Sequence, residues 1–212
     1  MIRTLNVCFD ILVIDDNSPD GTGTLADQLA QNDRALFVMH RPRKLGLGTA
    51  YIQGFRHALK NDYEYVLGMD ADLSHDPNDL PRLFSEVERG ADLAVGSRYI
   101  NGVRVNNWSF NRLLLSKCAN GYANFVLRTR IKDLTTGFRC YRAAALRRID
   151  FSDIKTRGYG FFIEMTYAFF RKGFCIKEVP IIFSGRENDV SKMSNGIKFE
   201  AFFSVIRMRL IK

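Results

Sequence analysis

Residues 65–72, YVLGMDAD, join an apolar run to two carboxylates. The run predicts a strand, and because side chains alternate along extended backbone, Asp70 and Asp72 face the same side. In an open α/β sheet, ligands bind at the carboxyl ends of the strands. Two hard oxygen ligands at that edge suit Mg²⁺ or Mn²⁺ bound to a substrate diphosphate. The alternative is a solvated acidic turn that caps the next helix.

Strands and helices alternate around this stretch. Helices are predicted around Leu25 and Leu29, over residues 48–60, and from Leu80 to a stop at Gly90. Apolar runs between them predict strands at residues 11–14, 36–39, 65–69 and 93–96. This order predicts an α/β fold with a Rossmann-like, mostly parallel sheet flanked by helices. Further along, we predict helices over residues 110–127, 160–172 and 197–211 and a strand over residues 177–183.

The composition is that of a globular protein with an anionic partner. The chain has 212 residues, 46% of them hydrophobic, and a net charge of +8. This charge is dispersed rather than gathered with stacking aromatics, so nucleic acid is not an expected partner. We see no signal peptide, and no apolar run approaches the ~18 residues that span a bilayer. The four cysteines lack metal-ligand spacing, which predicts reduced, mostly buried thiols in a cytosolic protein.

Further polar groups follow the predicted strands on the N-terminal side. Asp15 and Asp16 come directly after the strand at residues 11–14, where carboxylates accept hydrogen bonds from a ribose or base, or cap a helix. The segment Gly46-Leu47-Gly48 lacks the third glycine of a dinucleotide-binding fingerprint, which disfavours that interpretation. Lys44, beside these glycines, either reaches a phosphate or lies in solvent.

Basic side chains are candidates for phosphate binding. Any one of them alone is typical of a protein surface, but a set that converges on one crevice can hold a phosphate. The polar residues 184–192 have the composition of a lid that closes over a diphosphate. Glu164 lies in an otherwise apolar helix and is either functional or paired with an arginine. The basic candidates are Arg98, Arg112 with Ser116 nearby, Arg186 and Lys192.

The C-terminal residues 197–211 mix aromatic and aliphatic side chains with lysine and arginine. This pattern predicts a basic amphipathic helix. Such a helix lies on a membrane surface, where each basic residue adds ~1 kcal/mol beside anionic lipid. The alternative is a helix packed on the sheet, and the sequence leaves both open.

Several stretches together resemble one enzyme family. These stretches cover nearly the whole chain from residue 11 to residue 198: VIDDNSPDGTG, MHRPRKLGLGTAYIQGF, MDADLSHDP, GADLAVGSRY, NWSFNRLLLSKCAN, DLTTGFRCYR, GYGFFIE, EVPIIF and RENDVSKMS. The ordered set resembles the GT-A glycosyltransferases of family 2, and more narrowly the polyprenyl-phosphate (dolichyl-phosphate) mannose synthases. The resemblance implies a single GT-A domain over residues 1–212. Residues 11–100 are its expected nucleotide-sugar half, and residues 101–212 are its acceptor half with the amphipathic helix.

The resemblance also implies roles for individual residues. Metal coordination falls to Asp72 and Ser74, whereas Asp70 and Ala71 contact the donor. Asp15 or Asp16 binds the nucleoside, with Lys44 near the donor. Arg98, Arg112 and Ser116 bind the acceptor phosphate, and Arg186 and Lys192 form a lid. Thr136, Gly137 and Glu164 are pocket positions.

The implied activity is mannose transfer from GDP-mannose to polyprenyl (dolichyl) phosphate, with inversion and with Mg²⁺ or Mn²⁺. By analogy with phosphoserine, whose second pKa is about 6, a lipid phosphate is already ionised at neutral pH, so no general base is needed. Rival interpretations are another donor such as UDP-glucose, or an inactive truncated relative that acts as a membrane-associated subunit. The expected location is peripheral, on the cytoplasmic face of a membrane, with a membrane-anchoring subunit as a further partner.

The N-terminus departs from the family pattern. Family members begin with a strand that ends in a Pro-x-Tyr-Asn-Glu-like turn, and residues 1–10, MIRTLNVCFD, contain no such turn. That strand lies centrally, between the strands that end at Asp15 and Asp70. We therefore expect a fold that lacks the usual first strand, from a late start codon or a truncated gene product. Unpaired backbone groups and a void should follow, at ~1–3 kcal/mol for each buried orphan group.

Overall fold

The computed structural model describes residues 8–156, 158, 160–185 and 195–210. The N-terminal part contains β1 (Ile11–Asp15), α1 (Thr22–Asn32), β2 (Leu36–His40), α2 (Leu47–Lys60), β3 (Tyr65–Gly68), η2 (Pro77–Asp79), α3 (Leu80–Glu88) and β4 (Leu93–Ser97). The C-terminal part contains β5 (Val105–Asn106), α4 (Phe110–Leu127), β6 (Arg139–Arg142), α5 (Ala143–Leu146), α6 (Gly160–Arg171), β7 (Ile176–Pro180), β8 (Phe183–Ser184) and α7 (Asn195–Leu210).

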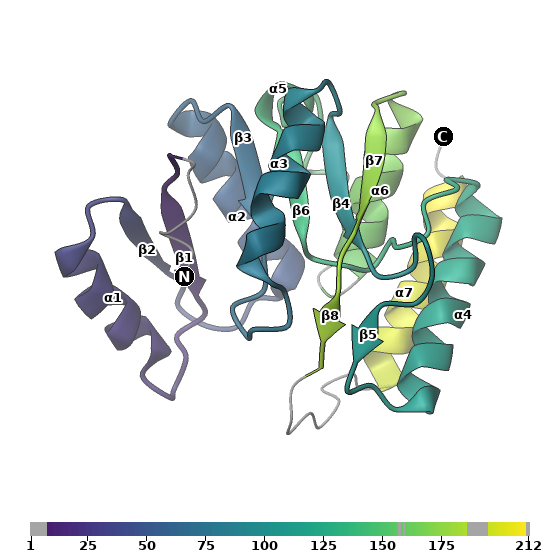
Figure 1. The fold of residues 1–212 in the computed structure, drawn as a ribbon, viewed down its shortest axis with the longest axis horizontal. Helices are drawn as coiled ribbons and strands as arrows, with labels where there is room; N and C mark the ends of the chain where they lie inside the picture. The colour runs from purple at the N-terminus through teal and green to yellow at the C-terminus, as the bar shows by residue number, and fades with distance from the viewer. Residues whose placement is uncertain (1–7, 157, 159, 186–194, 211–212) are drawn as a thin grey trace.

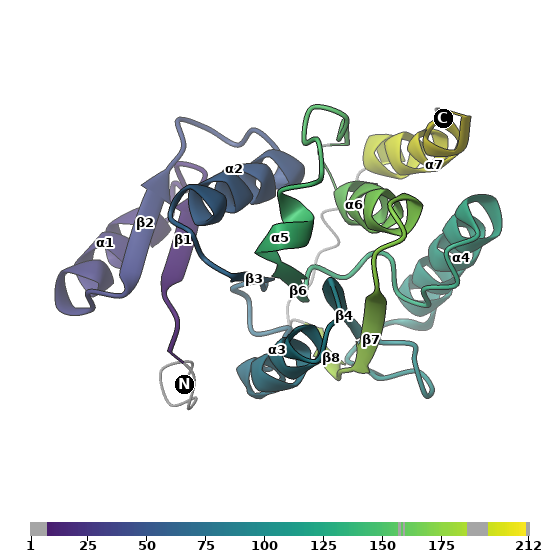
Figure 2. The same ribbon diagram turned by 90° about the horizontal axis from the view of Figure 1, so that it is seen from above.

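The strands form three sheets in the described part of the chain. The largest has the order β3-β6-β4-β7, and two smaller ones pair β1 with β2 and β5 with β8. Helices α2, α5 and α6 cover one face of the large sheet, and α3 covers the other (Figures 1 and 2). Helices α4 and α7 lie side by side beyond β7. The molecule is therefore an α/β layer structure, as the alternation of elements predicted.

The prediction of a mostly parallel sheet is wrong for the large sheet. Strand β6 pairs antiparallel with both β3 and β4, whereas β4 pairs parallel with β7. Strand β6 was not predicted, because its sequence, RCYR, has no apolar run. Arg139 in that strand is nevertheless completely buried, since backbone carbonyls of Thr136, Phe162 and Leu134 accept its N–H groups.

Strands β1 and β3 are neighbours that belong to different sheets (Figure 1). Strand β1 uses one edge for β2, and β3 uses one edge for β6. Within the described residues, no strand pairs with the remaining edge of either. Four of the five side chains of β1 are only half-buried, whereas all five of β4 are buried. The described fold thus has no strand at the place where the family pattern puts its first one.

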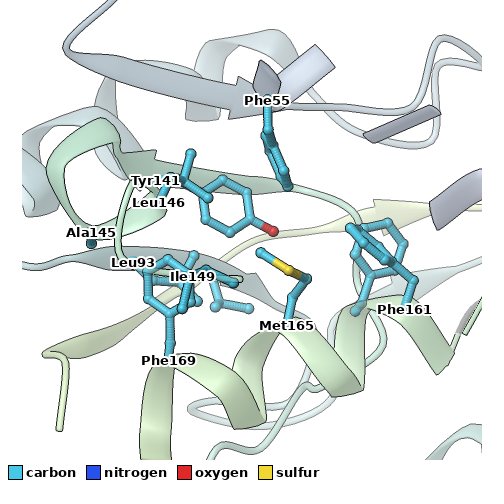
Figure 3. Close-up of a cluster of buried hydrophobic side chains, with 11 residues drawn as sticks. Phe55, Leu93, Tyr141, Ala145, Leu146, Ile149, Phe161, Met165 and Phe169 are labelled. Carbon is cyan, nitrogen blue, oxygen red and sulfur yellow. The ribbon is translucent and has the colours of Figure 1, made fainter. Parts of the chain in front are cut away.

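Two layers of apolar side chains sandwich the large sheet. On one face Leu93 and Val95 of β4 and Tyr141 of β6 pack against α6, chiefly against Met165 and Phe169 (Figure 3). Because side chains alternate along a strand, Ala94 and Cys140 point to the opposite face and meet Leu83 and Val87 of α3. The expectation of mostly buried cysteines is wrong, since Cys8, Cys118 and Cys175 are exposed. The sheet and its two covering layers form the main core.

Helices α4, α6 and α7 form a second core. Ala123 and Leu127 of α4 pack with Ile163 of α6 and with Val205 and Met208 of α7. Ser109 caps α4, since its hydroxyl accepts the N–H of Arg112. The predicted bounds of α4, residues 110–127, are confirmed. No described helix is both long and apolar enough to cross a membrane.

Candidate functional site

Asp70 and Asp72 lie in a tight turn that follows β3. The N–H of Ser74 donates to Oδ1 of Asp72 over 3.0 Å, which closes the turn. Leu73, between Asp72 and Ser74, has φ +63° and is 80% exposed. A leucine in the left-handed region costs about 1–3 kcal/mol, and such strain concentrates at functional sites. Since Leu73 buries almost nothing, its conformation is set by the positions of its two polar neighbours.

The buried side chain of His75 is hydrogen-bonded to this turn. Its Nδ1 accepts the backbone N–H of Asp70 over 3.3 Å, so the proton of the neutral ring is on Nε2. The ring is buried, stacks on Phe138 at 4.8 Å and meets Phe183 edge-on at 5.2 Å. This burial lowers the pKa of His75 to about 4, and the nearby Arg98 acts in the same direction. Among the described residues, Nε2 has no hydrogen-bond partner.

Gly137 lies against the carboxylate of Asp70. A Cβ at this position would be 3.2 Å from Oδ1 of Asp70 and 3.0 Å from the Phe162 ring, so any other residue would push these neighbours away by a few tenths of an ångström. The hydroxyl of Tyr51 donates to the carbonyl oxygen of Gly137 over 3.3 Å. Burial raises the pKa of Tyr51, and the charge of Asp70 adds to the effect. The structure thus brings the predicted pocket residue Gly137 next to Asp70.

Thr136 and Glu164 have visible structural contacts. The hydroxyl of Thr136 accepts the N–H of Phe138. Oε2 of Glu164 accepts the N–H and the hydroxyl of Thr156, at 2.8 and 2.5 Å. Oε1 of Glu164 pairs with Arg207 of α7 at 3.4 Å. Of the two alternatives for Glu164, pairing with an arginine is confirmed, because the structure shows that pair.

Arg98 is buried in a two-pronged ion pair with Asp133. Its Nε and Nη2 donate to the two carboxylate oxygens over 2.6 and 2.7 Å, and its backbone N–H also donates to Oδ2. Burial by itself would raise the pKa of Asp133, but the guanidinium outweighs it and holds that pKa below its ordinary value. The fork of Arg98 is therefore occupied. A forked contact to an acceptor phosphate would require this pair to open.

The ring of Trp108 makes cation–π contacts with both Arg98 and Arg112. The guanidinium carbon of Arg112 lies 4.4 Å from the centre of the Trp108 ring, and that of Arg98 lies 5.3 Å from it. The indole Nε1 is buried and has no partner among the described residues. Close by, the hydroxyl of Tyr99 donates to that of Ser116 over 2.6 Å. The structure therefore brings Arg98 and Arg112 to the same aromatic ring. Asp70 is close enough for its negative charge to favour the charged form of Arg98.

Asp15 and Asp16 end β1 and make different contacts. Asp15 is buried, accepts the N–H of Ser18, and lies 3.8 Å from His40. Hydrogen bonding by the Ser18 side chain is the main reason that the pKa of Asp15 is lowered, and the Ser18 N–H adds to it. Asp16 pairs with the buried Arg41 at 2.5 Å. Both carboxylates are thus held in place at the carboxyl end of β1, and nucleoside binding by either of them stays a prediction.

The two glycines at the start of α2 have structural reasons. Gly46 precedes the helix with φ +101°, a conformation that favours glycine. A Cβ on Gly48, in the first turn of the helix, would lie 2.6 Å from the carbonyl oxygen of Thr156 and 2.8 Å from the Phe161 ring. The backbone conformation of Gly46 and the close packing of Gly48 explain both glycines without a dinucleotide. Lys44 is exposed in the loop before them.

The donor set at the turn fits a divalent cation that a diphosphate helps to bind. Among the described residues, no cluster of three or more His, Cys, Asp or Glu side chains could hold a metal alone. Mg²⁺ is usually held by one or two carboxylates, together with substrate phosphates and water. Asp70 and Asp72, both half-buried, supply that number. Ser74 is buried beneath them, and its hydroxyl as a ligand stays a prediction.

The segment that leads to the predicted lid is anchored at this turn. The N–H of Ser184 in β8 donates to the carbonyl oxygen of Ser74 over 3.1 Å, and the N–H of Gly185 donates to that of Asn106 over 2.9 Å. Arg186 and Lys192 lie outside the described residues. Their predicted roles therefore stay predictions.

Four residues of this site were missed as candidates: Asp133, Trp108, His75 and Tyr51. All four lie in stretches that carry the family resemblance. Asp133 is the first residue of DLTTGFRCYR, Trp108 is the second residue of NWSFNRLLLSKCAN, His75 belongs to MDADLSHDP, and Tyr51 belongs to MHRPRKLGLGTAYIQGF. No role was assigned to Tyr51, since it is an aromatic residue on an amphipathic helix. Only the fold shows that it reaches Gly137.

Residues 7–153 match the family model described as Glycosyl transferase family 2. The chain belongs to glycosyltransferase family 2. Within this family, it is 50% identical over 196 residues to a polyprenol monophosphomannose synthase of Mycolicibacterium smegmatis, covering 92% of this chain and 74% of that protein. It is 47% identical over 201 residues to an undecaprenyl-phosphate mannosyltransferase of Micrococcus luteus, covering 95% of this chain and 82% of that protein.

Solved structures show the same fold. Crystal structures of glucosyl-3-phosphoglycerate synthase from Mycobacterium tuberculosis superpose with a TM-score of 0.65 for the complex with Mn²⁺, UDP and product, and 0.64 for the complex with Mn²⁺ and UDP-glucose. The first match has 17% sequence identity and covers 93% of this chain and 69% of that one. The family 2 chain therefore has a GT-A-like fold, and these neighbours bind Mn²⁺.

Proposed function

We propose that this chain transfers mannose from GDP-mannose to a polyprenyl phosphate, with inversion at the sugar carbon and with dependence on Mg²⁺ or Mn²⁺. The observation that carries the proposal is the meeting of three features at one place. The Asp70–Asp72 turn lies at the carboxyl end of β3, Gly137 lies against Asp70, and Arg112 stacks on Trp108 beside Arg98. Support for mannose and for the lipid comes from the names of the relatives that are 47–50% identical.

The donor binds, in this proposal, between the ends of β1 and β3, within residues 11–100. Asp15 or Asp16 holds the nucleoside, with Lys44 and Ala71 nearby, and Asp70 contacts the sugar diphosphate. Asp72, with Ser74, holds the divalent cation. When bound, the cation stabilises the negative charge that gathers on the leaving diphosphate. Arg186 and Lys192 close over that diphosphate.

The acceptor phosphate binds, in this proposal, against Arg112 and Ser116, within residues 101–212. The Arg112 guanidinium lies over the Trp108 ring, and this contact limits the directions that its five N–H donors take. Arg98 contacts the same ring, and its pair with Asp133 keeps it there. Thr136 and Gly137 shape the pocket wall near Asp70. An ionised phosphate needs no base, so none of these residues has to accept a proton.

The proposed location is the cytoplasmic face of a membrane, as a peripheral protein. The lipid acceptors in the names of the relatives support this proposal. A membrane-anchoring subunit is a further proposed partner.

A donor panel tests the proposal. The purified chain is incubated with undecaprenyl phosphate, MgCl₂ or MnCl₂, and radiolabelled GDP-mannose, UDP-glucose or GDP-glucose. The expected result is labelled lipid from GDP-mannose alone, lost on adding EDTA and restored by excess metal. Inversion predicts a β-linked product from the α-linked donor. Transfer from UDP-glucose, an α-linked product, or hydrolysis without transfer would each overturn the assignment.

A further inference from the structure

Strand β2 is the outermost strand of the N-terminal part and has an open outer edge (Figures 1 and 2). It pairs with β1 on one side, and no other strand in the described part of the chain pairs with it. The N–H of Arg41, directly after β2, donates to the carbonyl oxygen of Asp15 in β1. Because peptide groups alternate in direction along a strand, the N–H and C=O groups of Val38 point away from β1. They lie on the outer edge, where a further strand can pair with them.

The sequence of β2 does not protect this edge. Natural edge strands usually carry lysine, proline or a bulge that prevents further pairing. Residues 36–40, LFVMH, contain no lysine or proline, and their register with β1 is continuous. The ring of Phe37 meets that of His57 in α2 at a centroid distance of 6.4 Å, yet Phe37 stays 42% exposed. Both the backbone edge and part of an apolar face of β2 are thus open to a partner.

A groove lies between the end of β2 and helix α2. It has a volume of about 420 Å³, and Met39 lines it on the β2 side. The α2 residues that line it are Gln53, Arg56, His57 and Lys60. At 3.6 residues per turn these four positions share one face of the helix, and Phe55 and Ala58 are buried on the other. Among the described residues, no aspartate or glutamate lines the groove.

The groove is positively charged. Arg56 and Lys60 are exposed, and neither forms an ion pair with another described residue. Arg41, which also lines the groove, is already paired with Asp16. Lys60 lies in the last turn of α2, where the helix dipole favours a cation, but Arg56 lies before that turn. The groove therefore offers two cations to a ligand, close to the open edge of a strand.

We infer that the outer edge of β2 binds an extended acidic segment of another protein, which adds a third strand to the β1–β2 sheet and places carboxylates beside Arg56 and Lys60. In such contacts main-chain hydrogen bonds give the affinity, and side chains at alternate positions give the specificity. The acidic side chains of the segment point to the α2 face of the sheet. The residues between them point to the opposite face, where α1 packs on β2, so we expect apolar side chains there. Neither Arg56 nor Lys60 belongs to the proposed donor or acceptor site, so the inference is independent of the proposed transfer.

A second copy of this chain is a poorer partner. Two β2 edges that pair around a two-fold axis place both copies of α2 on the same face of the joined sheet. Arg56 and Lys60 of one copy would then lie near those of the other, and like charges repel one another at an interface. The sequence of β2 contains no acidic residue that offsets this repulsion.

Fluorescence polarisation of labelled synthetic peptides, titrated with the full chain, tests the inference. The probe is an octapeptide in which glutamate and valine alternate. We expect it to bind about tenfold or more tightly than the same peptide with lysine in place of glutamate. A third peptide keeps the glutamates but carries a methyl group on every backbone nitrogen, so it cannot donate hydrogen bonds to a strand. It should bind about tenfold or more weakly than the probe.

Two variants locate the binding surface. Arg56→Gln/Lys60→Gln should weaken binding of the probe about fivefold, since two exposed ion pairs are lost. Val38→Pro removes the outward N–H of β2, and proline is tolerated on an edge strand where its nitrogen faces solvent. It should weaken binding about tenfold. The glutamine variant changes only exposed side chains, so its melting temperature should equal that of the unmodified chain, and it decides the question if Val38→Pro unfolds.

The matched control removes two exposed cations at the other end of the molecule. Arg128→Gln/Arg130→Gln has the same net charge as Arg56→Gln/Lys60→Gln and acts at the end of α4 (Figure 1). It should bind the probe as tightly as the unmodified chain does.

Four results would overturn the inference. One is absence of binding of the glutamate probe. The second is equal binding of the methylated peptide, which would make the groove a site for anions in general. The third is an equal loss of binding in the control variant, which would reflect net charge rather than this surface. The fourth is self-association of the unmodified chain that Val38→Pro abolishes, because the β2 edge would then be a contact between copies.

Discussion

The two sheets that meet at the proposed donor site differ in how well they are buried. All five residues of β4 in the large sheet are buried, whereas Asp15 is the only fully buried residue of β1. In the described part of the chain, none of the buried members of the three core clusters comes before Phe55. The β1–β2 pair and α1 are therefore a thin layer, held to the rest largely through α2.

Because of this difference in packing, we expect the two parts of the proposed site to differ in rigidity. Asp70, Gly137 and His75 stand on the densely packed large sheet, while Asp15 and Asp16 stand on the thin layer. Local opening of a protein costs least where few apolar contacts are made. We therefore expect the residues proposed to hold the diphosphate to keep their geometry, and those proposed to hold the nucleoside to be the first to lose it.

The largest expected effect is a loss of stability when a buried ion pair next to the large sheet is broken. Asp133→Ala leaves the buried guanidinium of Arg98 without its partner, which should lower the free energy of unfolding by about 3–5 kcal/mol. The matched control is Asp62→Ala, which removes an exposed pair with Arg147 and should cost less than about 1 kcal/mol. Urea denaturation measures both. Equal costs would show that the Arg98 pair is not part of the rigid core.

A pair of leucines compares the two sheets directly. Leu93 is fully buried in β4 and Leu12 is half-buried in β1. Leu93→Ala should cost about 2–5 kcal/mol, since it leaves a cavity, whereas Leu12→Ala should cost about 1 kcal/mol. Chemical denaturation of both variants checks this. A cost for Leu12→Ala that equals the other would contradict the contrast in packing.

The proposed acceptor site gives a smaller effect. Trp108→Leu removes the ring that both Arg98 and Arg112 contact, and each cation–π contact is worth about 0.5–2 kcal/mol. We expect kcat/KM for polyprenyl phosphate to fall by about tenfold, while KM for GDP-mannose stays unchanged. Trp108→Phe should recover part of the loss. An equal change in both substrates would mean that Trp108 acts through the fold as a whole.

The smallest effect is a pH dependence in the thin layer. Hydrogen bonding to Asp27 is the main reason that the pKa of His40 is raised, and Asp15 adds to it. The folded state therefore holds this proton more tightly than the unfolded state does. The resulting stability is present below the ordinary His pKa of about 6.5 and is lost as the pH rises through the higher folded value. His40→Gln should abolish this part of the decline, as measured by urea denaturation across that range. An unchanged decline in the variant would rule out His40 as its source.

Local patterns predicted much of this fold. The periodicity gave the bounds of α4, and apolar runs located β1, β2, β3 and β4, because these elements follow rules of spacing within a few residues. Strand β6 was missed because carbonyls distant in sequence, those of Phe162 and Ala91, accept N–H groups of its arginines. The antiparallel pairing in the large sheet was missed for the same reason, because both antiparallel pairs include β6.

The site shows the same division. The acidic turn was visible because its chemistry is local to residues 70–72. The occupied fork of Arg98 was not, because Asp133 lies 35 residues away. The contact of Gly137 with Asp70 likewise depends on the pairing of β3 with β6. Contacts between distant segments are fixed by packing, and a single sequence does not display them.

The most direct test of the central claim is the rate of mannosyl transfer in Asp72→Asn, compared with Asp76→Asn. Asp76 belongs to the same loop and only caps the short helix η2, a role that asparagine can keep. We predict that Asp72→Asn lowers kcat/KM about a hundredfold or more with an unchanged melting temperature, while Asp76→Asn retains nearly full activity. Full transfer by Asp72→Asn, or equal losses in both variants, would contradict the account.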